Sequence, residues 1–143
     1  MSYIKSSLKR EEDMEYTIRQ ALLNNEYEEI EFYLAAGGDP DIIIEGEPLI
    51  LAALTFGSSS YIVDLLLHYG ANPNVENGYA IVQASKSGNV ENVDLLLEYG
   101  VDPSSHNNKA LLVAKSPEIR SSLINHRDFN DTLYDVKAAD LLF

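Results

Sequence analysis

Apolar residues recur at helical spacing in an eight-residue block that occurs twice along the chain. The block Val63–Gly70 reads Val-Asp-Leu-Leu-Leu-His-Tyr-Gly, and Val93–Gly100 repeats it thirty residues later with only His68 replaced, by Glu98. Within each block apolar side chains stand at positions i, i+3 and i+4, which form one face of an α-helix. The pattern therefore predicts helices that bury one face. Each helix should end at the glycine that closes its block, because glycine readily adopts the left-handed conformation found just after a helix.

A looser copy of this block and a set of similar turns extend the repetition toward both ends. The copy is Ile30–Gly37, and the three blocks lead into the turns Gly38-Asp39-Pro40, Ala71-Asn72-Pro73 and Val101-Asp102-Pro103. Another helix is predicted ahead of each block and in the last unit, over Thr17–Leu23, Pro48–Leu54, Ala80–Ser87 and Ala110–Lys115. Pro48 is expected in the first turn of its helix, where its missing N–H costs nothing. No strand is predicted, so the chain reads as a series of helical hairpins.

These units resemble the ankyrin repeat, a helix–turn–helix–loop unit of roughly 33 residues. Pro48–Ala53 stands where the family has Thr-Pro-Leu-His-x-Ala-Ala, and Gly70–Asn74 matches the family's Gly-Ala-Asp-x-Asn turn. The connecting fingers are two or three residues short, so long β-hairpin fingers are not expected. The resemblance covers about residues 15–125. It implies an all-α fold, a single ankyrin-repeat solenoid of stacked helix-turn-helix units with short loops.

The repeat boundaries predict how this domain is divided. We expect an N-terminal cap repeat, two full repeats, a truncated C-terminal repeat and a capping tail helix, at about residues 14–41, 42–73, 74–103, 104–125 and 126–143. The truncated repeat has Pro117 between its helices, so its second helix is expected to be short, with Ile119 and Leu123 as its core contacts.

The tail carries apolar residues on one side of a predicted helix. Tyr134, Ala138 and Leu141 share that face, and Asp131 stands where the helix would begin. A terminal repeat needs a cover on its open end, which favours a helix that folds back onto the stack. A short linear motif that docks into a partner's groove is the alternative, and disorder is a third.

Composition excludes several kinds of site. The 143 residues contain no cysteine, and His68, His106 and His126 lie in separate units without an i, i+4 partner. Thiol chemistry, thiolate metal sites and most histidine metal sites are therefore not expected. No apolar run approaches the ~18 residues that span a bilayer, and no signal peptide is visible. We expect a cytoplasmic protein that is not an enzyme, has no cofactor or metal, and is a monomer when free.

Negative charge is concentrated in the first half of the chain. The formal net charge is −13, which disfavours direct binding to nucleic acid or to an anionic membrane. Between Gln20 and Ser85 there are ten acidic residues and no lysine or arginine. A field of one sign can steer a partner of opposite charge, which indicates a basic protein. The alternative is that the acidity only keeps the protein soluble.

In the proteins that this chain resembles, loop tips and the exposed face of the first helices line a concave surface that binds other proteins. Carried over by position, the partner-binding residues would be Ile43, Glu45, Glu47, Leu54, Thr55, Glu76, Asn77, Tyr79, Lys86, His106 and Asn108. The run Ile42–Ile44 is unusual in a loop: it either packs on the neighbouring unit or forms an apolar anchor within an acidic rim.

The resemblance and the charge together favour a protein-interaction module, most simply an acidic inhibitor or immunity-type protein that binds a basic partner. A general adaptor or scaffold would rely instead on apolar loop anchors such as Ile43 and Tyr79. An acidic mimic of nucleic acid would require carboxylates spaced along one face.

Overall fold

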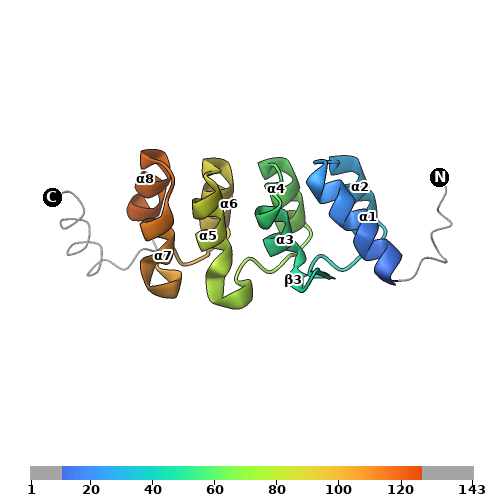
Figure 1. Cartoon of the computed structure of the whole chain (residues 1–143). Coiled ribbons are helices and arrows are strands. Elements are labelled where there is room, and N and C mark those ends of the chain that lie inside the picture. The colour runs from blue at the N-terminus through green and yellow to red at the C-terminus, as the bar shows by residue number, and fades with distance from the viewer. Residues whose placement is uncertain (1–10, 127–143) are drawn as a thin grey trace.

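The computed structural model describes residues 11–126, which form four helical hairpins in a row (Figure 1). Each hairpin joins a first helix to a second helix through a short link, and the all-α solenoid predicted from the sequence is confirmed. The helices are α1 (Glu11–Leu23), α2 (Tyr27–Ala35), α3 (Leu49–Thr55), α4 (Ser60–His68), α5 (Val75–Ser87), α6 (Val90–Glu98), α7 (Ser105–Val113) and α8 (Pro117–Asn125). The part described also contains two short strands, β2 (Ile43–Ile44) and β3 (Glu47–Pro48).

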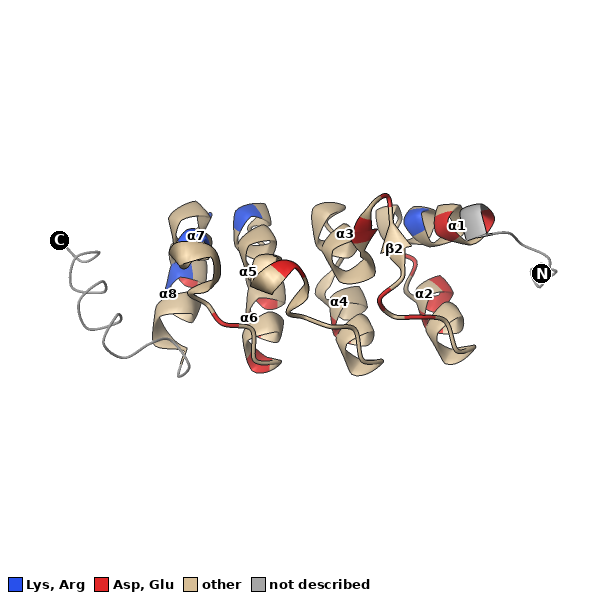
Figure 2. Cartoon of the chain, turned by 90° about the horizontal axis from the view of Figure 1, so that it is seen from below, with Lys and Arg blue, Asp and Glu red and all other residues tan. Residues whose placement is uncertain are grey.

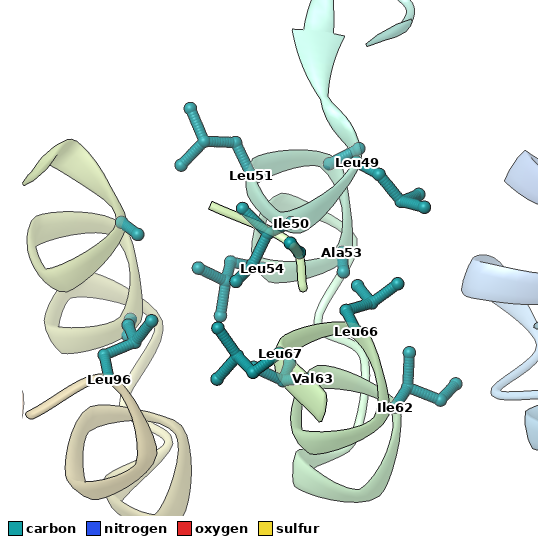
Figure 3. Packing of buried hydrophobic residues seen from close by; sticks show 14 of the residues in the cluster. Leu49, Ile50, Leu51, Ala53, Leu54, Ile62, Val63, Leu66, Leu67 and Leu96 are labelled. Carbon is teal, nitrogen blue, oxygen red and sulfur yellow. The ribbon is translucent and has the colours of Figure 1, made fainter. Parts of the chain in front are cut away.

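The hairpins are arranged in two layers. The first helices α1, α3, α5 and α7 form one row and the second helices α2, α4, α6 and α8 the other (Figure 2). The core lies between the rows and between neighbouring hairpins, where Ile50, Leu66 and Leu96 are fully buried (Figure 3). Ile81 of α5 is fully buried as well. Burying such a side chain stabilises the fold by about 1.5–3 kcal/mol, so each hairpin depends on its neighbours.

The second helices bury the apolar face that the repeated block predicts. Val63 and Val93 are each 0% exposed, and the glycine after each block has a positive φ of 96° at Gly70 and 89° at Gly100. The N–H of Gly70 donates to the carbonyl oxygen of Leu67 at 3.0 Å, which satisfies a carbonyl at the helix end. These helices therefore end where glycine permits it.

The prediction that no strand forms is wrong for the first finger. Strands β2 and β3 pair antiparallel across a two-residue turn in which Glu45 has φ 51° and Gly46 has φ 83°. Two positive φ angles in succession are what a tight hairpin turn requires. The strands alternate as expected: Ile44 is fully buried, whereas Ile43 is 54% exposed. Pro48 belongs to β3 and precedes the first residue of α3, so it does not lie within the helix as expected.

The last hairpin is shortened in its first helix and not in its second. From Tyr79 α5 continues to Ser87, whereas from the corresponding Lys109 α7 continues only to Val113. Helix α8 has nine residues, as α4 and α6 do, which corrects the expectation of a short helix. Its first residue is Pro117, tolerated there because the N–H it lacks would have no partner in the helix.

The core contacts predicted for that helix are confirmed, since Ile119 and Leu123 are both 0% exposed. The predicted tail helix, from Asp131 onward, lies outside the described residues.

Candidate functional site

A groove of about 620 Å³ opens between α3 and α5 on the side of the fingers. Its walls come from both helices, and its rim comes from the fingers that lead into α5 and α7. The lining residues are Glu47, Leu51, Thr55, Glu76, Asn77, Tyr79, Gln83, Lys86 and His106. We call this hollow the α3–α5 groove.

The α3–α5 groove brings together seven of the residues carried over from the resemblance, namely Glu47, Thr55, Glu76, Asn77, Tyr79, Lys86 and His106. Ile43 and Glu45 lie outside it, both exposed on the β2–β3 hairpin. Asn108 is half-buried in the turn that holds His106 and does not line the groove.

Leu54 is the one candidate that the structure places in the core. Its side chain is 1% exposed and lies between α3 and the next hairpin (Figure 3). Every residue from Leu49 to Leu54 is buried, because α3 packs against α4 and α5 and against the β2–β3 hairpin. Leu54 therefore supports the groove from behind and cannot contact a partner.

Two lining residues were missed by the sequence reasoning. Leu51 stands one helical turn before Thr55, and Gln83 stands one turn after Tyr79 and one turn before Lys86. Residues three or four apart share a face of a helix, so this spacing was a signal that could have identified both.

The rim of the groove is built from two left-handed turns. Glu76 and Asn77 have φ angles of 52° and 58°, and His106 and Asn107 have φ angles of 56° and 59°. Left-handed conformation costs a residue with a Cβ roughly 1–2 kcal/mol, so such runs are uncommon and tend to occur where a chain presents side chains to a partner.

Contacts between the two turns hold the rim together. The Nε2–H of His106 donates to the carbonyl oxygen of Glu76 across 2.9 Å. The His106 ring also lies edge-on to Tyr79, with ring centroids 5.3 Å apart. Aromatic pairs favour this arrangement. The finger that leads into α7 therefore fixes the position of the finger that leads into α5, and Tyr79 is held at the groove wall.

Charge in the groove is mixed but mainly acidic. Glu47 accepts a hydrogen bond from the Thr55 hydroxyl at 3.3 Å, and Glu76 is exposed at the rim. Lys86 also lines the groove, beside these carboxylates. Within residues 11–126 Lys86 has no carboxylate within 4.0 Å, whereas Arg19 pairs with Glu45 at 2.5 Å outside the groove.

Carboxylates also occupy the row of second helices (Figure 2). Helices α2, α4 and α6 carry no lysine or arginine and seven acidic residues, Glu28, Glu29, Glu31, Asp64, Glu91, Asp94 and Glu98. A shallower hollow of about 260 Å³ lies between α4 and α6 beside Tyr61. The negative field therefore covers both layers of the solenoid.

Over residues 11–126 no group of three or more His, Asp or Glu side chains is placed to hold a metal ion. None of the helices in that range has the length and apolar character needed to cross a membrane.

The comparison with known families agrees with this architecture. A family model described as ankyrin repeats (3 copies) matches residues 18–107 and, in a second overlapping match, residues 49–132. The chain belongs to the ankyrin-repeat family. Ankyrin repeats are modules for protein–protein interaction, and members of the family are typically not enzymes. A search of curated proteins found no match to this ankyrin-repeat chain.

Proposed function

We propose that this ankyrin-repeat chain binds a basic segment of another protein in the α3–α5 groove and thereby inhibits it, as an immunity-type protein would. The observation that carries the proposal is the meeting of Glu47 and Glu76 with Tyr79 in one concave site, although they come from two different repeats. A basic surface covered by this groove is no longer available to its own ligand, so binding alone would inhibit.

The lining of the groove supports a partner that carries lysine or arginine. A cationic side chain can pair with Glu47 or Glu76 while its aliphatic stem lies against Tyr79. Tyrosine is also among the residues that most often dominate binding energy at interfaces. Outside the groove, the surrounding negative field accelerates encounter with a basic protein.

The direct test compares two charge reversals of equal size. Glu47→Lys/Glu76→Lys changes the groove, whereas Glu28→Lys/Glu31→Lys makes the same change in net charge on α2. Glu45 is left intact because its reversal would break the pair with Arg19. Each immobilised protein is incubated with extract of the source cell, and a partner that depends on the groove is purified for titration.

We expect wild type and the α2 variant to capture the same basic protein and to release it at high salt. The groove variant should bind it at least about thirtyfold more weakly, since losing a buried charge pair at an interface costs about 2 kcal/mol or more. Equal losses in both variants, or full binding by the groove variant, would contradict the proposal. Measuring the partner's own activity with and without the chain then separates an inhibitor from an adaptor.

An adaptor function is the second candidate, and the exposed Ile43 favours it. This side chain is 54% exposed at the end of the first finger, where it could serve as an apolar anchor. If the chain is an adaptor of this kind, Ile43→Ser should weaken partner binding more than the groove reversal does. The same titrations decide between the two.

A mimic of nucleic acid is less well supported by the spacing of charges. Glu31, Asp64 and Asp94 occupy equivalent positions in successive second helices. Packed helices lie about 8–10 Å apart, whereas duplex DNA carries one charge per about 1.7 Å of its axis. The carboxylates of this row are therefore much sparser than phosphates.

A further inference from the structure

One position of the repeat changes from buried to exposed at the last hairpin. Leu51 in α3 and Val82 in α5 occupy the same place, six residues before the glycine that follows each helix, and they are 5% and 0% exposed. Leu112 is the counterpart of Val82 thirty residues later, and it is 77% exposed. In the earlier repeats the next hairpin covers this position, whereas α7 is the last first helix described (Figure 1).

The surface around Leu112 is partly apolar and is rimmed by positive charge. Val113 and Ile124 are half-buried beside the core. Lys109 is exposed one turn before Leu112, and the Nη1–H of Arg120 donates to the carbonyl oxygen of Leu111 at 3.5 Å, which places its guanidinium next to α7. We call this surface the α7–α8 end face.

This end face differs in charge from the rest of the described chain. Helices α1 to α6 contain only Arg19 and Lys86 as strong bases, whereas the last hairpin and its link contain Lys109, Lys115 and Arg120. An acidic, partly apolar segment would therefore bind better at the α7–α8 end face than anywhere else on the solenoid.

The chain itself contains such a segment immediately after α8. Residues 127–143 carry four aspartates against one arginine and one lysine, and they place Tyr134, Ala138 and Leu141 at helical spacing. The segment starts directly after the last described hairpin, since α8 ends at Asn125 and the Nε2–H of His126 donates to the carbonyl oxygen of Leu97 in the neighbouring α6 at 3.0 Å.

Length and charge both favour the end face over the groove for this segment. The four residues before Asp131 span up to about 14 Å, which exceeds the 8–10 Å between packed helices. A helix beginning at Asp131 could therefore reach α7. The α3–α5 groove, in contrast, holds Glu47 and Glu76, which would repel four aspartates.

We propose that residues 127–143 dock as a helix on the α7–α8 end face, cover Leu112, and complete the stack from within the same chain. The apolar face of the tail takes the place of a fifth hairpin. The negative charge of its aspartates complements the positive charge of Lys109 and Arg120. This proposal is independent of the proposed function, since it concerns a different surface and needs no partner.

Hydrogen exchange on the full chain tests the docking. Leu112→Asp puts a charge at the centre of the end face, and Tyr61→Asp is the matched control at a position that is also exposed, 76%, but on α4. We expect amides of residues 133–141 to be protected in wild type and in the control. Because covering a leucine is worth roughly tenfold or more in an equilibrium constant, Leu112→Asp should reduce that protection by about tenfold. Unprotected amides in wild type, or equal protection in both variants, would overturn the proposal.

Disulfide trapping then identifies the occupant, and the absence of cysteine from the chain makes this experiment clean. Leu112→Cys is combined in turn with Tyr134→Cys, Ala138→Cys or Leu141→Cys, and Tyr61→Cys with the same tail cysteines serves as control. We expect at least one Leu112 pair to form an intramolecular disulfide at a rate independent of protein concentration, and at least tenfold faster than its control. Disulfide-linked dimers that increase with protein concentration would show that a second copy of the chain covers the end face. If the Tyr61 control pairs form disulfides as fast as the Leu112 pairs, the tail does not bind specifically at the end face. Either result overturns the proposal.

Discussion

Replacing Gly78 by alanine tests whether the left-handed turns at the groove rim are held by close packing as well as by backbone conformation. Gly78 has φ 86°, and a Cβ built there would lie 2.4 Å from the Oγ and 3.1 Å from the Cβ of Ser105 on the neighbouring finger. Gly100 is a matched control, because its φ is 89° but a Cβ there would have no atom within 4 Å. The two substitutions therefore share the conformational cost, and only one creates a clash.

The expected magnitudes follow from these contacts. Alanine in the left-handed region costs about 1–2 kcal/mol, so Gly100→Ala should lower the free energy of unfolding by about that amount. In Gly78→Ala the Ser105 side chain must also turn away. It then loses the hydrogen bond that its Oγ donates to the carbonyl oxygen of Asp102 at 2.7 Å. Such a bond contributes about 0.5–1.5 kcal/mol, so Gly78→Ala should cost about 2–3 kcal/mol in total.

Urea unfolding followed by circular dichroism measures both values, provided that the slope with denaturant is unchanged. A double-mutant cycle with Ser105→Ala, which removes the closest clashing atom, should show a coupling energy of about 1 kcal/mol. If Gly78→Ala is no more destabilising than Gly100→Ala, or the coupling is zero, then the finger-to-finger contact does not constrain the rim and the reasoning is wrong.

Two further predictions concern single side chains. Burial, with a smaller contribution from the negative charge of Asp39, raises the pKa of Tyr33 above its usual value. The stability contributed by the neutral phenol should therefore be complete below about pH 10 and be lost as pH rises through the folded-state pKa. Between about pH 8 and pH 11 the free energy of unfolding should accordingly decrease less for Tyr33→Phe than for wild type. An equal decrease in the two proteins would contradict this. The side chain of Asn89 caps α6 by accepting from the N–H of Asn92 at 3.0 Å, whereas Ser59 at the start of α4 makes no such side-chain bond. In urea unfolding, Asn89→Ala should accordingly lower the free energy of unfolding by about 1 kcal/mol, and Ser59→Ala should leave it almost unchanged. Equal losses for the two variants would refute the assignment of the cap.

Much of the fold was predictable because the sequence of each repeat is sufficient to predict its local structure. The spacing of Val63, Leu66 and Leu67 predicts a buried helical face, and Gly70 predicts where that helix ends; both depend on contacts within a few residues. The thirty-residue repetition then predicts stacking, because a hairpin with one apolar face needs a neighbour to cover it.

Other features required the tertiary structure. Leu54 has the same residue type as exposed leucines elsewhere, and only the packing of α3 against α5 shows that it is buried. Asn92 is polar yet 2% exposed, and its Nδ2–H donates to the carbonyl oxygen of Ser58 in the preceding hairpin at 3.3 Å. Neither fact follows from periodicity, which gives the face of a residue but not what lies opposite it.

The candidate site divides in the same way. Position within the repeat identified seven groove residues, and helical spacing could have added Leu51 and Gln83. The sequence by itself determined the helical hairpins, their order and their excess of acid, since these depend on residue type and local spacing. Only the tertiary structure decided that Glu47, Glu76 and Tyr79 meet in one groove and that carboxylates cover both layers, because the direction of a side chain depends on how neighbouring repeats pack.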